Sequence, residues 1–302
     1  MNFIKRNIIT IVIIVISFLI IGIIAVDEKQ SVEFTNMNIQ STINNCKKVL
    51  KDTKSDKTNI EMCEKIIKND GMQVDFYTAY TDLLVFRLHH LNVIAFLLLI
   101  IPSMYGICNK LKYKYIKNAL TRQSYSKFLV DFFKEAYKYI WLLPLISLYI
   151  MLIVSSYTTF DLTYAISNYS VSWNYELISK PVLFIVLYMI NILFHSFFFI
   201  NLSLIIAKKI NKYIPCILLS FLSYIAIELF LEVGVSMLVF NIIFKSDFGI
   251  IFNVMNLFMF NTVFGIIPLL LFSFCVMILS FIILYFTYRN KEQLIMSCEK
   301  NI

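Results

Sequence analysis

Residues 265–287 read Gly-Ile-Ile-Pro-Leu-Leu-Leu-Phe-Ser-Phe-Cys-Val-Met-Ile-Leu-Ser-Phe-Ile-Ile-Leu-Tyr-Phe-Thr, and this stretch contains no Asp, Glu, Lys or Arg. A run of about 20 apolar residues is long enough for a helix to cross the hydrocarbon core of a membrane. Five more such runs precede it in the 302-residue chain: Ile8–Val26, Leu88–Ile107, Tyr139–Tyr157, Pro181–Ala207 and Tyr213–Val233. The sequence therefore predicts an all-α polytopic membrane protein with six transmembrane helices.

The composition agrees with a membrane protein, since 59% of the residues are apolar, 15% are charged and the mean hydropathy is +0.76. Soluble domains average about 25% charged residues. The chain has only 6 glycines and 5 prolines, and no G-x-x-x-x-G-K-[ST] motif. It therefore lacks the glycine-rich loop that binds ATP phosphates, so any energy source for a transport activity would have to be an ion gradient or another polypeptide.

Lysine and arginine are distributed unevenly between the two sides of the membrane. One side has 16 basic and 4 acidic residues, and the other has 11 basic and 15 acidic residues. Because basic loops stay in the cytoplasm, we expect a multi-pass protein of the cell membrane with both termini cytoplasmic. The same asymmetry explains the basic isoelectric point without nucleic-acid binding. The basic side comprises 1–7, 108–138, 208–212 and 288–302, and the other side comprises 27–87, 158–180 and 228–264.

The first hydrophobic segment is a candidate signal peptide, because Lys5 and Arg6 precede it. Its apolar run of 19 residues exceeds the roughly 7–15 residues of a signal core. No small-x-small cleavage motif precedes Asp27. We therefore expect residues 1–26 to be a short tail and an uncleaved membrane anchor.

Residues 27–87 form the one sizeable hydrophilic segment and are predicted to be an extracellular helical domain. Apolar residues at helical spacing predict two helices, around 39–50 and 60–67, joined by a polar turn. The capping box Thr58–Glu61 and the stop Asn69–Gly71 support the second helix. Cys46 and Cys63 lie on the apolar faces of these helices. They form either a disulfide that stabilises a small module or two buried free thiols.

The loop at 108–138 has two short apolar stripes, at 116–120 and 128–137, separated by a polar stretch at 121–126. This pattern predicts a short helix, a turn and an amphipathic helix near the inner leaflet. A basic interfacial loop and a docking element for a cytosolic protein both fit these residues.

The run Ile116-Lys-Asn-Ala-Leu-Thr-Arg-Gln-Ser-Tyr-Ser-Lys-Phe-Leu-Val-Asp-Phe-Phe-Lys134 resembles the corresponding loop of ABC-2 type transporter permeases, of the kind that gives bacteria resistance to antimicrobial peptides, lantibiotics and bacitracin. Gln123 stands where that family usually has proline. The resemblance implies that this loop carries a coupling helix contacting an ATPase subunit. By position, the coupling residues are Ile116, Lys117, Asn118, Leu120, Thr121 and Arg122.

The same resemblance implies a second permease subunit, as a homodimer or heterodimer, and two copies of a cytosolic ABC ATPase that carry ATP and magnesium. No cofactor is then bound directly by this chain.

The predicted segments are 88–107, 139–157, 181–207, 213–233 and 265–287 as helices two to six, with 158–180 as an outer loop and 288–302 as a cytoplasmic tail. Residues 234–264 are broken by glycine and polar residues, so they are predicted to form a re-entrant outer hairpin, which the family also has.

Four polar residues within the predicted spans are candidates for the substrate pathway: Asn191, His195, Glu228 and Glu232. Ionisable residues are costly inside a membrane and are therefore functional candidates. Glu228 either attracts a cationic or amphipathic substrate or is a packed or interfacial acid. His195 and its neighbouring amides form either a polar seam between helices or part of a proton path. No spacing of His, Cys, Asp or Glu predicts a metal site, and no catalytic constellation is present.

The predicted function is therefore a permease subunit without its own ATPase site, which exports or clears amphipathic or antimicrobial peptides or similar hydrophobic compounds. Its expected partners are the ATPase, the second permease, membrane lipid and the substrate. The alternative is a non-transporting membrane sensor whose extracellular helical domain captures a peptide. A membrane enzyme lacks residues to support it.

Overall fold

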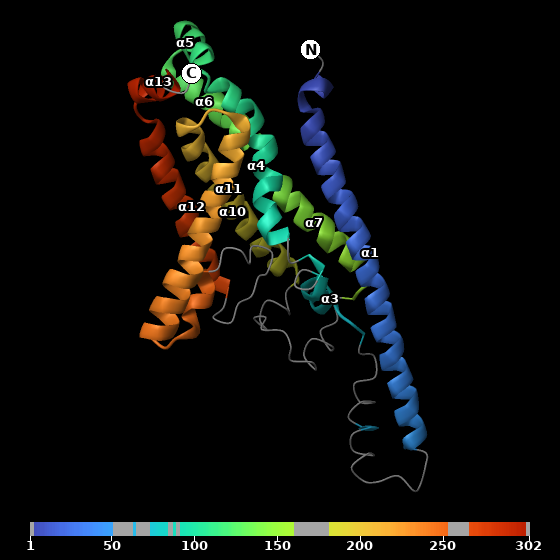
Figure 1. Ribbon diagram of the computed structural model, residues 1–302. Helices are drawn as coiled ribbons and strands as arrows, with labels where there is room; N and C mark the ends of the chain where they lie inside the picture. Colours follow the sequence, from blue (N-terminus) through green and yellow to red (C-terminus); the bar gives the residue numbers. More distant parts are fainter. Residues whose placement is uncertain are drawn as a thin grey trace. The chain divides into compact units, whose positions relative to one another are not determined.

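The computed structural model describes residues 3–50, 63–64, 73–83, 87–88, 91–159, 181–252 and 266–299 (Figure 1). Helices make up nearly all of this part of the chain, and its one strand-like pairing is an isolated bridge between Asp75 and Thr159. Five helical stretches are long and apolar enough to cross a membrane. The protein is thus an all-α membrane protein. The five stretches are Val93–Lys110, Tyr125–Ser155, Ile185–Lys209, Tyr213–Ile243 and Ile267–Tyr288.

The chain divides into two compact units. Unit 1 comprises Met1–Ile16, His90–Ser147 and Ile185–Ile302, and unit 2 comprises Ser17–His89 and Leu148–Phe184. Helices α1 (Phe3–Val49), α7 (Leu142–Ser155) and α10 (Pro181–Lys209) have residues in both units.

Unit 1 is a bundle of long helices with three short helices gathered at one end, which we call the α5 end (Figure 1). The short helices are α5 (Tyr113–Arg122), α6 (Tyr125–Ala136) and α13 (Lys291–Glu299). The long helices are α4 (Leu91–Lys110), α10, α11 (Tyr213–Leu229) and α12 (Ile266–Tyr288). A 3-10 turn, η2 (Tyr137–Tyr139), connects α6 to α7.

Aromatic side chains form the centre of unit 1. The Phe96 ring of α4 stacks on the Tyr224 ring of α11 at 4.9 Å, and both rings contact Phe199 of α10 at 5.1 Å. All three side chains are fully buried. Because lipid is as apolar as a helix surface, close packing of this kind, rather than the hydrophobic effect, holds helices together in a membrane.

Helices α10 and α12 are joined by a line of polar contacts. The Ser273 hydroxyl donates to Asn191 Oδ1 at 2.6 Å, and the Asn201 amide donates to Ser280 Oγ at 2.9 Å. The Lys208 ammonium donates to the Thr287 carbonyl. From Asn191 to Lys208 along α10, the bonded residues of α12 also follow one another in chain order, from Ser273 to Thr287, so the two helices run parallel. Buried hydrogen bonds between helices stabilise such pairs by about 1 kcal/mol or less each.

Unit 2 ties the later part of α1 to α3 (Phe76–Asp82). Asn36 Oδ1 accepts a hydrogen bond from the Val74 amide at 2.9 Å, and Arg87 pairs with Glu28 at 3.5 Å. Gly22 allows the approach of α7, because a Cβ there would lie 2.9 Å from the Tyr149 hydroxyl. The Phe18 ring meets the Tyr149 ring edge-on at 4.9 Å.

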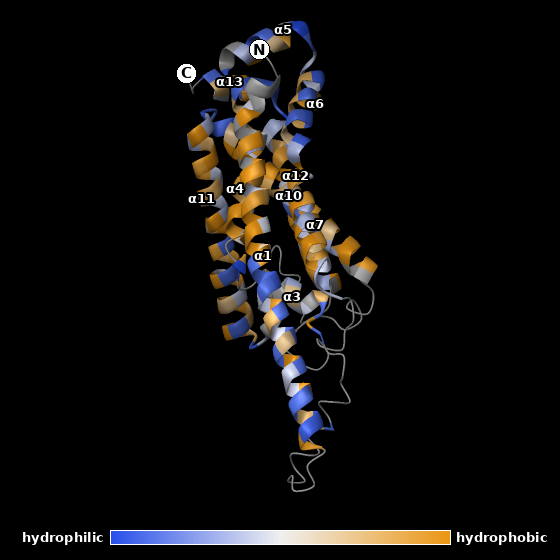
Figure 2. Cartoon of the chain, turned by 90° about the vertical axis from the view of Figure 1, so that its right-hand side faces the viewer, coloured by the Kyte–Doolittle hydropathy of each residue, from blue (hydrophilic) through white to orange (hydrophobic). Residues whose placement is uncertain are grey.

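Helix α1 extends for 47 residues and does not end with the hydrophobic segment at Val26, as the sequence analysis assumed. Figure 2 shows its colouring change from orange to mixed blue while the helix continues. Residues 27–50 contain neither glycine nor proline, so nothing in the sequence stops the helix where the hydropathy falls. The helix expected around 39–50 is thus the end of α1.

Helix α11 likewise continues beyond Val233, where we placed the end of the fifth span. It passes into a π-helical segment, η3 (Phe230–Ile243), and Gly234 lies inside that segment. The chain reverses near Lys245, which has the positive φ of 51° found at helix ends. A 3-10 segment, η4 (Asp247–Phe252), then packs along η3 and stacks Phe252 on Phe240 at 5.1 Å.

Several predictions lie outside the described residues. They are the capping box at 58–61, the stop at 69–71, most of the second outer helix at 60–67, nearly all of the outer loop at 158–180 and the later part of the hairpin at 253–264.

Candidate functional site: the helical platform at the α5 end

The loop at 108–138 folds into two helices with a short turn, as its pattern predicts. Helix α5 ends at Arg122 because Gln123 is extended (φ −149°, ψ 157°). Ser124 is the N-cap of α6, and its hydroxyl oxygen accepts a hydrogen bond from the Lys127 amide at 3.4 Å. The polar turn is therefore limited to residues 123–124, and the flanking residues 121–122 and 125–126 are helical.

Helix α5 presents one face and buries the other. Ile116 is 0% exposed, and α13 packs against α5. Ile116 therefore helps to position α5, and its place among the coupling residues stays a prediction from the resemblance. Leu120 is half-buried, and the remaining candidate coupling residues are exposed: Lys117, Asn118, Thr121 and Arg122. These exposed residues and the accessible part of Leu120 are available for contact with a second protein.

The C-terminal segment is a helix, whereas the sequence analysis treated it as a tail. Asn290 Oδ1 accepts hydrogen bonds from the amides of Glu292 and Gln293, at 2.9 and 3.2 Å, and so caps α13. Leu294 and Cys298, four residues apart, are both buried. An asparagine followed by two apolar residues at helical spacing is the signal that would have identified this helix.

Tyr288, the last residue of α12, connects three helices. Its hydroxyl donates to the Leu204 carbonyl of α10 at 2.8 Å, and its ring packs against Phe132 and Phe133 of α6. Its carbonyl accepts a hydrogen bond from the Tyr125 hydroxyl of α6 at 2.5 Å. The side chain is 2% exposed, so α6 is held firmly against the ends of α10 and α12.

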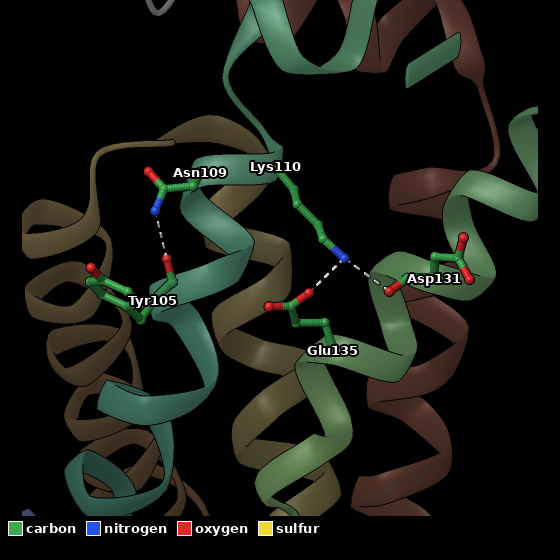
Figure 3. Close-up of polar contacts among 5 residues, drawn as sticks. All are labelled: Tyr105, Asn109, Lys110, Asp131 and Glu135. Atoms are coloured by element: carbon green, nitrogen blue, oxygen red, sulfur yellow. Dashed lines mark hydrogen bonds and ion pairs between the residues drawn. The ribbon is translucent and has the colours of Figure 1, made fainter. Parts of the chain in front are cut away.

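An ion pair fastens α6 to α4 (Figure 3). Lys110 Nζ lies 2.7 Å from Glu135 Oε2 and donates to the Asp131 carbonyl at 3.2 Å. Figure 3 shows the Lys110 side chain reaching from the last turn of α4 across to α6. Beside it, the Asn109 amide donates to the Tyr105 carbonyl of its own helix at 3.2 Å. Both charged side chains are mostly shielded from solvent, with 18% and 34% exposed.

Gly106 makes room for this ion pair. A Cβ at position 106 would lie 2.3 Å from Glu135 Oε1 and 3.0 Å from Glu135 Cδ. Any larger residue would therefore displace the carboxylate. Sequence analysis missed Gly106, Lys110 and Glu135, because their pairing depends on how α4 and α6 are aligned and not on local spacing.

Helix α4 is also joined to α11 near the α5 end. The Tyr213 hydroxyl donates to the Ile101 carbonyl at 2.9 Å, and the Asn211 amide donates to the Leu111 carbonyl at 3.4 Å. The thiols of Cys108 and Cys216 share a hydrogen bond, and both are buried. Through α4, the loop helices are thus linked to α11.

Most exposed charges at the α5 end are positive. The exposed acids in the described part of this end are Asp131, Glu292 and Glu299. Clustered cations produce a positive potential that attracts acidic proteins or anionic lipids. Among the residues whose exposure the structure describes at this end, the exposed basic ones are Lys112, Lys117, Arg122, Lys127, Lys134, Lys138, Lys209, Lys212, Arg289 and Lys291.

The four candidate pathway residues fall into two groups. Asn191 and His195 lie in the α10–α12 seam, where Asn191 bonds Ser273 and His195 Nδ1 lies 2.9 Å from the Asn191 carbonyl. Glu228 is 1% exposed and lies one turn after Tyr224, whereas Glu232 is exposed. Phe199 contacts His195 and Tyr224, so its ring lies between His195 and the turn of α11 that precedes Glu228.

Cys46 and Cys63 are adjacent in unit 2. Both are free thiols that share a hydrogen bond, and this bond raises the pKa of Cys63 above its ordinary value. The disulfide stays a prediction. Within the described residues, no group of three or more His, Cys, Asp or Glu side chains is arranged to hold a metal ion.

No protein-family model, curated protein or solved structure matches this chain. The resemblance to ABC-2 permeases therefore stays a prediction from the residues of the 116–134 segment.

Proposed function

We propose that the chain is the permease subunit of an ATP-driven exporter, similar to ABC-2 type permeases, and that a cytosolic ATPase binds the exposed face of α5. The observation that carries the proposal is the attachment of α5. A short basic helix is held at the end of the bundle by Ile116 and α13, and α6 beside it is fastened to α4 by the Lys110–Glu135 pair. Such a helix can transmit force from a soluble motor to the membrane helices.

In this proposal the chain crosses the membrane six times with the α5 end in the cytoplasm, because that end carries the excess of Lys and Arg. The additional span is the first part of α1. It exposes large apolar side chains along its length, including Ile8, Val15 and Ile23, which soluble proteins do not leave uncovered. The hairpin predicted at 234–264 is part of this proposal: the chain reverses at Lys245 and η4 packs on η3, while residues 234–243 continue the helix of α11 without a break.

Transport then proceeds by movement of α5 when two ATPase subunits close on ATP and magnesium. The movement passes through the Lys110–Glu135 pair to α4, and from α4 to α11 through Tyr213 and the Cys108–Cys216 contact. A second permease subunit, identical or not, completes the pathway. The substrate is an amphipathic or antimicrobial peptide or a similar hydrophobic compound, with Glu228, Glu232, His195 and Asn191 along its route.

The test uses this chain expressed with an ABC ATPase from the same genome and reconstituted in nanodiscs. Wild type should co-purify with the ATPase and hydrolyse ATP. Arg122→Glu should lose both, because it reverses the charge on the exposed face of α5. Lys212→Glu is the matched control, since it makes the same charge change at an exposed residue of the same end and should retain both.

Two results would contradict the proposal. One is ATPase association that is unchanged by Arg122→Glu. The other is binding of an extracellular peptide by the purified chain with no ATPase in any preparation, which would support the sensor alternative through the compact unit 2.

A further inference from the structure

Helix α1 has one buried face and one exposed face within unit 2. The buried face comprises side chains that are at most 6% exposed: Ile21, Ala25, Val32, Ile43 and Cys46. The exposed face carries large apolar side chains: Ile20, Ile23, Phe34 and Met37. Successive residues of an α-helix point about 100° apart, so Ile23 lies on the side opposite to Ile21. Apolar side chains are thus left uncovered along one side of α1.

The exposed face of α1 follows the spacing of a coiled coil. Its positions recur at alternating steps of three and four residues, and each is exposed: Ile20, Ile23, Asp27, Gln30, Phe34, Met37, Ser41 and Asn44. Helix α1 is α-helical without interruption over this range, so these residues form one continuous stripe, which we call the α1 seam. A repeat of about 3.5 residues is the pattern by which one long helix packs lengthwise against another. The α1 seam is therefore suited to contact with a second helix.

The α1 seam continues beyond the boundary of the membrane. Residues 8–26 contain no charged side chain, and the charged run Asp27–Lys29 marks the end of the proposed first span. Phe34 and Met37 lie about 10 and 15 Å farther along the helix and are each 64% exposed. Lipid tails can cover the apolar residues of the span, but they do not extend to Phe34 and Met37. Exposed apolar residues at that height indicate a contact with another protein.

A second copy of this chain fits the α1 seam at every height. The excess of Lys and Arg on one side gives every copy the same orientation in the membrane, so the α1 helices of two copies are parallel. A twofold axis along the membrane normal then places each seam residue opposite its own counterpart. Phe34 and Met37 meet identical apolar side chains. The amides of Gln30 and Asn44 can pair with themselves, because an amide both donates and accepts hydrogen bonds.

Asp27 is the one charged residue of the α1 seam. In a pair of copies its carboxylate faces an identical carboxylate at the membrane boundary, and like charges repel each other. A different partner would present its own side chains at this height and would not incur this repulsion. The effect of removing the Asp27 charge therefore distinguishes a second copy from any other helix on this face.

We propose that this chain forms a parallel homodimer through the α1 seam. The second copy is then the second permease subunit, so the inference rests on the proposed first span and the proposed second subunit, but not on the ATPase. The paired helices are in contact from Ile20 to Asn44, which is about 36 Å of helix. Because the contact uses the exposed face of α1, it leaves the buried face and the packing of unit 2 unchanged.

The first test is disulfide cross-linking between copies of the full chain in membranes. Ser41→Cys places a thiol in the α1 seam, and Gln40→Cys is the matched control, because Gln40 is exposed at the same height but points about 100° away. Copper phenanthroline should join copies of Ser41→Cys at least about tenfold more than copies of Gln40→Cys, since a disulfide needs the two Cβ atoms close together. Peptide mass analysis should show that the link joins position 41 to position 41, and wild type gives the background from Cys46 and Cys63. Labelling of Gln40→Cys in intact cells by a membrane-impermeant maleimide tests separately whether this segment lies outside.

The second test measures the dimer dissociation constant of the fluorescently labelled chain in liposomes, by single-molecule photobleaching at increasing dilution in lipid. Phe34→Asp should raise the constant at least about tenfold, because it places an acid in the centre of the interface. Gln40→Asp, which introduces the same side chain outside the α1 seam, should leave the constant unchanged. Asp27→Asn should lower it about fivefold, because it removes the repulsion between the two carboxylates.

Four outcomes would overturn the proposal. Equal cross-linking at positions 40 and 41, or a dissociation constant unchanged by Phe34→Asp, would show that copies do not meet at the α1 seam. An unchanged or weaker dimer in Asp27→Asn would show that the two helices are not parallel and in register. Failure of the impermeant maleimide to label Gln40→Cys would overturn the proposed first span and the homodimer with it. Loss of ATPase association in the earlier test would contradict the proposed function alone.

Discussion

The Lys110–Glu135 pair makes a quantitative prediction, because it is the ion pair that the structure describes between the loop helices and the long helices. Glu135→Gln removes the negative charge but keeps the shape of the side chain. Lys110 then retains its hydrogen bond to the Asp131 carbonyl and loses its closest partner, at 2.7 Å. Helix α6 should separate from α4 more often.

The expected size follows from the exposure of the two side chains, 18% for Lys110 and 34% for Glu135. Fully exposed ion pairs contribute about 0.2–1 kcal/mol, and hydrogen bonds to charged groups contribute about 1.5–3 kcal/mol. A partly shielded pair should therefore contribute about 1 kcal/mol. This corresponds to a roughly fivefold change in the population of the open state.

Gly106→Ala should have the same effect on α6 for a different reason. The added Cβ would lie 2.3 Å from Glu135 Oε1, so the carboxylate must move away from Lys110. Alanine also stabilises an α-helix by about 1 kcal/mol relative to glycine. The substitution should thus loosen α6 while making α4 itself more resistant to opening.

Amide hydrogen exchange of the nanodisc-reconstituted protein measures both helices separately. Exchange across α6 should become about fivefold faster in Glu135→Gln and in Gly106→Ala, and exchange in α4 should slow only in Gly106→Ala. The two changes together should add little in α6, because they remove the same contact. Glu292→Gln, at an exposed acid of α13, is the control. Unchanged exchange in α6, or fully additive effects, would refute the assigned role of the pair.

Two further predictions concern cysteines. Mild oxidation with copper phenanthroline should form a disulfide between Cys108 and Cys216, because their buried thiols share a hydrogen bond. Peptide mass analysis should detect this disulfide in wild type and not in Cys216→Ser. Its absence in wild type would contradict the α4–α11 contact. In reduced protein, Cys63 should react with maleimide more slowly than an ordinary thiol at neutral pH, since its raised pKa keeps it protonated, and its rate should rise with pH through that raised pKa. Cys46→Ala removes the hydrogen bond and should bring the maleimide reaction rate of Cys63 toward that of an ordinary thiol. Wild-type protein isolated without reductant should contain the 46–63 disulfide if unit 2 faces an oxidising compartment.

The sequence predicted helices correctly where a long apolar run or a helix cap specifies the helix locally. The long apolar runs coincide with α4, α10 and α12 to within a few residues, because length and composition alone decide such helices. The polar turn before α6 was predicted for a similar reason, since Ser124 is a favourable helix cap.

The ends of two helices, α1 and α11, were predicted wrongly from hydropathy. A change from apolar to polar residues marks the edge of a membrane, but a helix ends only where the backbone conformation changes. Helix α1 continues beyond Asp27 because no glycine or proline follows until residue 71, and η3 continues past Gly234 until the positive φ of Lys245. The expected outer domain therefore begins as an extension of the first helix.

Contacts between distant residues could not be predicted from one sequence. Lys110 and Glu135 are 25 residues apart, and the hydroxyl and ring of Tyr288 contact residues more than 80 positions away. Each of these pairs depends on the rotation of one helix against another, which the hydrophobic pattern leaves undetermined because membrane helices are apolar on most faces.

These contacts also restrict how force can pass through unit 1. Helices α4 and α11 are joined at the α5 end by Tyr213 and the Cys108–Cys216 pair, and in the middle by the stacked rings of Phe96 and Tyr224. Two helices fastened at separated levels cannot rotate independently without breaking buried contacts at one of them. A displacement of α5 should therefore move α4 and α11 as one body. In the proposed transport cycle, the relative motion that opens a pathway should then occur where the packing is weaker, and η3, in which no residue is buried, meets that condition.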